Sequence, residues 1–264
     1  MGNFTFKKSL GQNFLNDMNV IHKIVNSADI DKDTLLIEIG PGSGAITKYI
    51  VPLCGHALLY EADSRLENRL REVLSSCDNY SIIIGDFLKC DVANDIFKYK
   101  YKKIYVVANL PYYITTPIIM KFIDILPDKF VIMVQKEVAF RLAADIGNRD
   151  YGSLTVFLNY FYDIRKLFDV SRNCFVPKPN VDSAVVEMNL KRNRLEVNDM
   201  VLFRQVVKDS FRYKRKNIKN NLKNYDLKVV LDVLKEYGYD LDVRAEMLCF
   251  EFFVELSNRL KNTI

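Results

Sequence analysis

Short apolar runs, often β-branched, alternate with helix-like segments through the first two-thirds of the chain. Five runs predict buried strands: Leu35–Ile39, Ala57–Glu61, Tyr80–Ile84, Ile104–Ala108 and Phe130–Val134. Segments with a helical spacing of apolar residues, such as Asp63–Ser75 and Thr115–Leu126, lie between most of them. Because parallel neighbours need crossover connections, this alternation predicts an α/β fold with a mainly parallel sheet covered by helices on both faces.

The pattern changes toward the end of the chain. Two later runs, Leu154–Phe161 and Ser183–Leu190, have no helix-length segment between them and predict an antiparallel pair that closes the sheet edge. From about Met200 onward the spacing is helical, without a strand-like run. A chain of 264 residues can hold one full domain and a smaller one. We therefore expect an α/β domain over residues 1–190 and a small all-helical domain over residues 191–264.

Composition excludes several classes of protein. The chain is 49% apolar and 27% charged, which is typical of globular proteins. No apolar run approaches the roughly 20 residues that span a bilayer, and the first residues lack the apolar core of a signal peptide. The five cysteines form no CxxC pair, and His22 and His56 are the two histidines of the chain. We expect a cytoplasmic protein with reduced thiols, no metal site and no histidine-based mechanism.

The net charge of +5 comes from one part of the chain. Residues 189–264 carry 16 basic and 11 acidic side chains, whereas the rest is balanced. The stretch Arg204–Lys223 contains a single acidic residue, Asp209, and eight basic ones: Arg204, Lys208, Arg212, Lys214, Arg215, Lys216, Lys219 and Lys223. Such a patch suits a polyanion such as RNA, but a solvated helix face is the other interpretation, and charge alone leaves both open.

Candidate ligand-binding residues follow three of the predicted strands. The first strand runs into "EIGPGSGAIT", whose Gly40, Gly42 and Gly44 permit close backbone approach to a ligand and a tight turn into a helix. Glu61 ends the second strand and can accept both hydroxyls of a ribose. Asp86 follows the third and offers an acceptor to an adenine amine. Each feature alone could be a turn or a surface carboxylate; together they predict an adenosine-containing ligand, and the lack of a following Lys-Ser/Thr disfavours a triphosphate.

The fourth strand ends in Asn109-Leu110-Pro111-Tyr112 at the same edge. If the ligand is S-adenosylmethionine and the substrate an adenine amine, the Asn109 side-chain oxygen and the Leu110 carbonyl are two acceptors for the amine protons. Pro111 restricts Leu110 to an extended conformation, and Tyr112 offers a ring on which the base can stack. Methyl transfer of this kind depends on positioning more than on a strong base. The alternative is an ordinary asparagine-proline turn with a packed tyrosine.

With "GQNFLND", "EIGPGSGAIT", "NLPYYITTP", "FVPKPNVDSAVV" and "SFRYKRKNIKNNL", the chain resembles the ribosomal RNA small subunit adenine dimethyltransferase family over nearly its whole length. It is most similar to the branch that modifies two adjacent adenosines near the 3′ end of small-subunit (16S) rRNA. The large-subunit branch, which confers macrolide resistance, matches less well. The resemblance implies a Rossmann-like S-adenosylmethionine-dependent methyltransferase with a helical RNA-binding domain, acting in small-subunit biogenesis.

The resemblance also implies roles for individual residues. Methyl-donor contacts fall on Asn13, Leu15, Gly40, Gly42, Glu61, Asp86 and Asn109. Phe175 would face the target base opposite Tyr112. RNA contacts fall on Arg212, Lys214, Arg215, Lys216 and Lys219. The expected partner is small-subunit rRNA within the immature subunit, with no membrane, and we expect a monomer.

Three other functions stay open at this point. One is a non-catalytic RNA-binding assembly or transcription factor on the same scaffold, although the intact Glu61, Asp86 and Asn-Leu-Pro-Tyr favour an enzyme. The others are a large-subunit rRNA adenine dimethyltransferase and a DNA adenine methyltransferase.

Overall fold

The computed structural model describes residues 12–261. The chain divides into two compact units, which are described separately. The first takes the described residues up to Ala139 together with Arg165–Leu190, and the second takes Phe140–Ile164 together with the residues from Lys191 onward. Residues 140–164, which the residue pattern placed in the first domain, thus belong to the compact helical unit.

The first unit is built on a seven-stranded sheet in the order β4-β3-β2-β5-β6-β9-β7. Its strands are β2 (Thr34–Ile39), β3 (His56–Glu61), β4 (Tyr80–Ile84), β5 (Lys103–Asn109), β6 (Lys129–Gln135), β7 (Tyr162–Val170) and β9 (Ser183–Leu190). β4, β3, β2, β5 and β6 pair in parallel, and β9 runs antiparallel to β6. All five strands predicted in the first part of the chain are confirmed. β4 is only half-buried, because it lies at an edge of the sheet.

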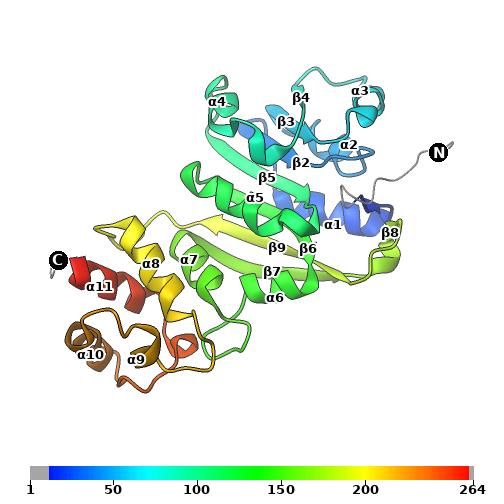
Figure 1. The fold of residues 1–264 in the computed structure, drawn as a ribbon. Helices are drawn as coiled ribbons and strands as arrows, with labels where there is room; N and C mark the ends of the chain where they lie inside the picture. The colour runs from blue at the N-terminus through cyan, green and yellow to red at the C-terminus, as the bar shows by residue number, and fades with distance from the viewer. Residues whose placement is uncertain (1–11, 262–264) are drawn as a thin grey trace. The chain divides into compact units, whose positions relative to one another are not determined.

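Helices cover the sheet. They are α1 (Met18–Ala28), α2 (Thr47–Ile50), α3 (Glu67–Val73), α4 (Val92–Phe97), α5 (Thr115–Lys121) and α6 (Lys136–Leu142). In Figure 1, α5 lies in front of the sheet and α1 behind it. The Asp17 carboxylate begins α1 by accepting hydrogen bonds from the Asn19 and Val20 amides. Every residue of β2 is buried, which explains its continuous apolar run.

The direction in which strands are added reverses between β2 and β5. From β2 the chain proceeds outward through β3 and β4, and it then returns to place β5 and β6 on the other side of β2. At such a switch point the loops after neighbouring strands diverge and leave a crevice at their carboxyl ends. A separate two-stranded sheet of β1 (Phe14–Leu15) and β8 (Phe175–Val176) pairs Leu15 with Phe175.

One predicted strand is wrong. The run Leu154–Phe161 lies in helix α7 (Ser153–Phe161), so it does not pair with Ser183–Leu190. Most side chains of α7 are buried, and a helix buried on nearly all sides has no amphipathic pattern to separate it from a buried strand. The neighbour of β9 is instead β7, which starts directly after α7. Its mostly half-buried or exposed residues gave no strand-like apolar run.

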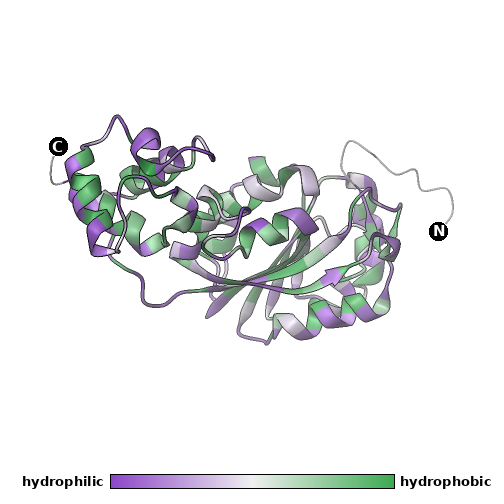
Figure 2. Ribbon diagram, turned by 90° about the horizontal axis from the view of Figure 1, so that it is seen from below, coloured by the Kyte–Doolittle hydropathy of each residue, from purple (hydrophilic) through white to green (hydrophobic). Residues whose placement is uncertain are grey.

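The second unit contains helices. Besides α7 they are α8 (Met200–Ser210), α9 (Ile218–Asn221), α10 (Leu227–Glu236) and α11 (Phe250–Lys261). Between Met200 and Lys261 the structure has no strand, as the spacing of apolar residues predicted. The core is aromatic: the Phe157 and Phe203 rings stack, and Phe252 meets Phe253 edge to face at 5.1 Å. In Figure 2, hydrophobic and hydrophilic residues are interleaved along α11, the helix next to the C-terminus.

Candidate active site

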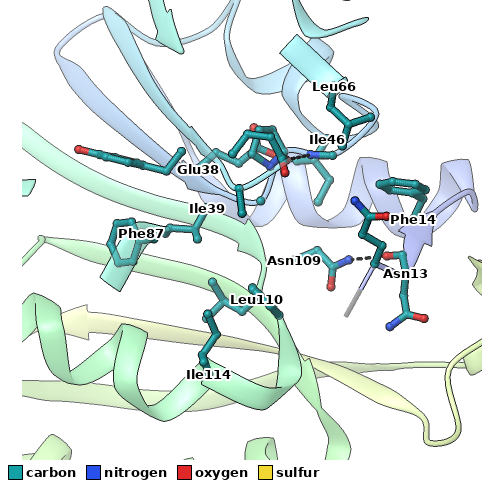
Figure 3. Close-up of a pocket in the computed structure, with 18 of the residues that line it drawn as sticks. Asn13, Phe14, Glu38, Ile39, Ile46, Leu66, Phe87, Asn109, Leu110 and Ile114 are labelled. Atoms are coloured by element: carbon teal, nitrogen blue, oxygen red, sulfur yellow. Dashed lines mark hydrogen bonds between the residues drawn. The ribbon is translucent and has the colours of Figure 1, made fainter. Parts of the chain in front are cut away.

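A cavity of about 330 Å³ opens at the carboxyl ends of the parallel strands. It lies at the switch point, and all of its lining residues belong to the first unit. Ten of the predicted site residues line it: Asn13, Leu15, Gly40, Gly42, Glu61, Asp86, Asn109, Leu110, Pro111 and Tyr112. Apolar side chains such as Ile39, Ile46 and Phe87 form part of its walls (Figure 3). The size and mixed lining are those of a small-molecule site.

The glycine loop after β2 is shaped by two close contacts. Gly42 has a φ of +60°, and a Cβ atom there would lie 2.7 Å from the Phe14 ring. Its amide donates a hydrogen bond of 2.9 Å to Oε2 of Glu61, and the Gly40 amide donates to the Tyr60 carbonyl at 2.8 Å. The loop is therefore tied to the end of β3, with a backbone conformation that favours glycine at both positions.

Two carboxylates stand where β3 and β4 end. Glu61 is 5% exposed, and its Oε1 accepts the Asp63 amide at 2.8 Å. Burial raises the pKa of Glu61. Each of its oxygens takes one backbone N–H and retains a second lone pair for a ligand hydroxyl. Asp86 is exposed, and its Oδ1 accepts the Leu88 amide at 3.0 Å.

The Asn109 side chain at the end of β5 has a defined orientation. Its Nδ2 donates to the backbone carbonyl of Asn13 at 3.1 Å, as Figure 3 shows. Since a carbonyl can only accept, the nitrogen must face Asn13 and Oδ1 must point elsewhere. That oxygen is buried and has no hydrogen-bond partner within residues 12–261. A buried acceptor without a donor costs about 1–3 kcal/mol. The site thus presents an acceptor suited to a ligand N–H.

The residues after Asn109 are held by the neighbouring strands. The Leu110 amide donates to the Met133 carbonyl in β6 at 3.0 Å, and Pro111 is extended, with φ −61° and ψ 122°. The Tyr112 hydroxyl is hydrogen-bonded to the Ser183 hydroxyl at the start of β9. Burial raises the pKa of Tyr112. Its ring is therefore anchored at the pocket wall, whereas the next residue, Tyr113, is 60% exposed at the same pocket.

Phe175 lies elsewhere. It is 3% exposed and packs in the hydrophobic core with Leu15, Ile21 and Ile24. It is not among the residues that line the cavity, so the structure does not bring its ring together with Tyr112. Stacking of Phe175 on a target base stays a prediction, and it requires this ring to be uncovered.

Among the lining residues that sequence reasoning missed, two shape the pocket or its electrostatics. Glu38 lies in β2, lines the pocket and is 2% exposed. Burial raises its pKa to about 8, and the negative charge of Glu61 acts in the same direction. A carboxylate within the otherwise apolar run "LLIEI" was the available signal, because acidic residues are rarely buried. Phe14, whose ring limits Gly42 to glycine, had no signal in the spacing of residues.

The predicted RNA-binding residues lie in the second unit. Arg212, Lys214, Arg215, Lys216 and Lys219 are all exposed, and most of them lie in the loop between α8 and α9. Other cations of this unit are paired, for example Arg259 with Glu236 and Glu255. Over the described part of the chain, none of these five makes an ion pair with a carboxylate. They form a positive surface that local acids do not neutralise.

Two kinds of feature are absent from residues 12–261. Among these residues, no group of three or more histidine, cysteine, aspartate or glutamate side chains is arranged to hold a metal ion. Within the same range, no helix combines the length and apolar character needed to cross a membrane.

The sheet, the switch-point pocket and its glycine loop, carboxylates and Asn-Leu-Pro-Tyr turn define an α/β transferase that binds an adenosine-containing ligand. The model of the family described as "Ribosomal RNA adenine dimethylase" matches residues 3–262. This chain therefore belongs to the ribosomal RNA adenine dimethylase family. The resemblance and the Rossmann-like methyltransferase fold expected from the sequence are both confirmed.

Particular members of the family are similar to this chain over nearly its whole length. The chain is 43% identical over 270 residues to "Ribosomal RNA small subunit methyltransferase A" of Bacillus thuringiensis and of Bacillus mycoides, covering 97% of this chain and 92% of each relative. The solved dimethyladenosine transferase of Plasmodium falciparum matches with a TM-score of 0.80 and 26% identity, over 94% of this chain and 98% of that one.

A large-subunit enzyme is nearly as similar in fold. The solved 23S rRNA methyltransferase ErmE matches with a TM-score of 0.76 and 26% identity, over 94% of this chain and 100% of that one. The fold therefore does not discriminate between ribosomal subunits. The sequence identity does discriminate, because it is 43% to the small-subunit methyltransferases and 26% to the 23S rRNA enzyme.

Proposed function

We propose that this enzyme of the rRNA adenine dimethylase family dimethylates the exocyclic amines of two adjacent adenosines near the 3′ end of small-subunit (16S) rRNA, in the course of small-subunit biogenesis. S-adenosylmethionine is the methyl donor. The observation that carries the chemistry is the buried Oδ1 of Asn109, which has no hydrogen-bond partner among the described residues and lies at the rim of a nucleoside-sized pocket. The choice of subunit is supported by the 43% identity to small-subunit methyltransferases.

The residues of the pocket fit this donor, which supplies a methyl group on a positively charged sulfur. Glu61 keeps acceptor capacity for ribose hydroxyls, and the Gly42 amide fixes the orientation of its carboxylate. Asp86 would accept from the adenine amine, since only its Oδ1 is engaged by Leu88. Asn13, Leu15 and Gly40 line the same cavity and would complete the contacts.

The reaction needs a target amine whose lone pair is available. An adenine amine is a poor nucleophile because its lone pair is delocalised into the ring. Asn109 Oδ1 and the Leu110 carbonyl would accept hydrogen bonds from its two N–H groups, and these two hydrogen bonds would turn the amine out of conjugation. Pro111 keeps Leu110 extended, and Tyr112, anchored through Ser183, supplies a wall for the base. The residues act by position and charge, without a general base of high pKa.

The proposal extends to the substrate and the cellular setting. Arg212, Lys214, Arg215, Lys216 and Lys219, which are exposed and form no ion pair within residues 12–261, would bind the phosphates of rRNA in the immature small subunit. We propose that it acts as a monomer. We propose that it acts in the cytoplasm, away from membranes.

Mapping the methylated positions tests this proposal. The purified protein is incubated with labelled donor and unmodified small subunits, and modified nucleotides are located by primer extension and mass spectrometry. We expect dimethyladenosine at two neighbouring positions near the 3′ end of the small-subunit rRNA. Modification of large subunits or of duplex DNA instead would establish one of the alternatives. Binding to small subunits without any methyl transfer would indicate a non-catalytic assembly factor.

A further inference from the structure

An exposed tyrosine lies within the basic loop between α8 and α9. Tyr213 is 55% exposed, whereas Tyr151 and Tyr160 of the same unit are 2% and 6% exposed. Its ring is therefore outside the aromatic core formed by Phe157, Phe203 and their neighbours. A single exposed aromatic residue is common on protein surfaces, so exposure alone carries no conclusion.

The backbone of Tyr213 is held in place by Asn221 in α9. Asn221 Oδ1 accepts the Tyr213 amide at 3.0 Å, and its Nδ2 donates to the carbonyls of Tyr213 at 3.3 Å and Lys216 at 3.4 Å. The Lys216 amide also donates to the Tyr213 carbonyl at 2.9 Å, which closes a turn. An amide side chain thus fixes both peptide groups that flank the ring. The ring is presented on an ordered loop, which lowers the entropy cost of binding through it.

One cation lies beside this ring, and others are its neighbours in sequence. The Arg212 guanidinium lies 5.6 Å from the Tyr213 ring centroid, and Lys214, Arg215 and Lys216 follow directly in sequence. Tertiary structure brings the backbone of Arg149 to this loop: Lys214 Nζ donates to the carbonyl of Arg149 at 3.1 Å, 65 residues away. The Arg149 side chain is exposed and, in the part of the chain that the structure describes, makes no ion pair. Aromatic and cationic groups interleaved in this way match the bases and phosphates of a single strand.

We propose that this loop binds an unpaired stretch of the RNA substrate, with the Tyr213 ring stacked on a base and the neighbouring cations on the adjoining phosphates. The inference rests on the proposed function and specifies which RNA feature the helical unit recognises. In a duplex the faces of the bases are covered by their neighbours, so only looped or single-stranded nucleotides offer a surface to a tyrosine. Asn221 is the positioning residue, because it contacts the loop backbone and leaves the ring exposed.

Two RNA probes and the full-length protein test the inference. One probe is a hairpin with a four-nucleotide loop, and the other is a blunt duplex with the sequence of the hairpin's stem. Affinities are measured by fluorescence anisotropy over a series of salt concentrations. We expect Tyr213→Ala to weaken hairpin binding about tenfold, within the range for loss of one stacked base. Tyr213→Phe keeps the ring and should bind like the wild type. Duplex binding should not change.

Salt dependence separates stacking from charge. Tyr213→Ala removes no phosphate contact, so the slope of log Kd against log salt should be unchanged, whereas Arg215→Ala should reduce it for both probes. Tyr239→Ala, a 37% exposed tyrosine of the same unit outside the loop, is the matched control and should have no effect. Asn221→Ala should weaken hairpin binding, but it should add nothing further in the Tyr213→Ala background, because a positioning residue acts through the ring.

The outcomes that overturn the inference are specific. Equal loss on hairpin and duplex, no loss on either, or failure of Tyr213→Phe to restore binding would each reject stacking on an unpaired base. The proposed function is judged separately by the map of methylated adenosines. If the wild-type protein methylates the expected adenosines and Tyr213→Ala binds the hairpin as tightly as the wild type, the stacking role alone is rejected.

Discussion

The Asn109 side-chain nitrogen and the Asn13 backbone carbonyl are joined by a hydrogen bond of 3.1 Å, between residues 96 positions apart in the chain. This bond determines which end of the Asn109 amide faces the pocket. It also ties the N-terminal segment to the end of β5, so that the residues proposed to contact the methyl donor and the target amine share one rigid corner. The acceptor on Asn109 is therefore preorganised before any substrate arrives.

Replacement of Asn109 tests that acceptor. We expect Asn109→Ala to lower the rate of methyl transfer to unmodified small subunits by about 100- to 1,000-fold, the usual effect of removing one preorganised polar group at a reacting centre. Single-turnover transfer of labelled methyl groups is the measurement. Asn94→Ala, an exposed asparagine of the same unit, is the control. A rate within twofold of the wild type for Asn109→Ala would contradict the proposed role.

A methyl group at Gly42 should close part of the pocket. Gly42→Ala places a Cβ 2.7 Å from the Phe14 ring in a backbone of positive φ, so either Phe14 or the glycine loop must move. Because the Gly42–Glu61 hydrogen bond moves with the loop, we expect the affinity for S-adenosylmethionine to fall about tenfold or more. Calorimetry measures this affinity.

Gly238→Ala is the matched control for backbone strain. Gly238 also has a positive φ, +77°, but nothing lies within 4 Å of its Cβ position. Both variants should lose about 1–2 kcal/mol of stability from the left-handed conformation. Only Gly42→Ala should lose donor binding; an equal loss in the two variants would mean that strain, and not the Phe14 contact, is responsible.

Glu38 should make stability depend on pH near neutrality. Burial raises its pKa from 4.5 to about 8, so the folded protein binds this proton more tightly than the unfolded chain does. Between those two values the unfolded state loses its proton first, and the free energy of unfolding falls as pH rises, by up to about 1.4 kcal/mol per pH unit. The raised pKa of Glu61 acts in the same direction.

Urea unfolding of Glu38→Gln between pH 5.5 and 8.5 measures this effect. The variant cannot ionise, so its stability relative to the wild type should increase steadily with pH. Glu72→Gln, at an exposed ion pair with Arg69, should leave the pH dependence unchanged. Parallel curves for wild type and Glu38→Gln would show that Glu38 is ionised in the folded protein throughout this range.

Charge reversal tests the basic loop. Arg215→Glu combined with Lys216→Glu should weaken RNA binding and flatten its salt dependence, by about 0.7–0.9 in logarithmic slope for each lost phosphate contact. The double reversal Lys228→Glu with Lys235→Glu, at exposed positions of α10, changes net charge by the same amount. If both pairs have equal effects, the loop contributes only overall charge.

Much of the fold could be predicted because buried parallel strands are continuous apolar runs. The predicted run Tyr80–Ile84 coincides with β4, and the other early strands differ by a few terminal residues at most. The assignment failed at α7, where burial on nearly all sides removed the helical period. It also missed β7, whose residues are mostly half-buried or exposed at the sheet edge.

The site could be predicted to the same extent and for a related reason. In a parallel sheet all strands end at one edge, so Gly40, Glu61, Asp86 and Asn109 were expected to meet, and they line one cavity. Local pattern could not show that Phe175 packs in the core, because an aromatic side chain serves a core and a binding site equally well. Nor could it show the neutralising effect of burial on Glu38.

By itself, the order of residues determined the strands, the shared edge of their chemically active ends, the family and the location of the excess positive charge. The strands and the charge depend on composition and periodicity within short segments, whereas the family follows from the resemblance of whole motifs. Tertiary structure alone decided the direction of the Asn109 amide, the confinement of Gly42 by Phe14, and the meeting of Lys214 with Arg149. Each is a contact between residues far apart in sequence, and such contacts are set by how the whole chain packs, which no local spacing encodes.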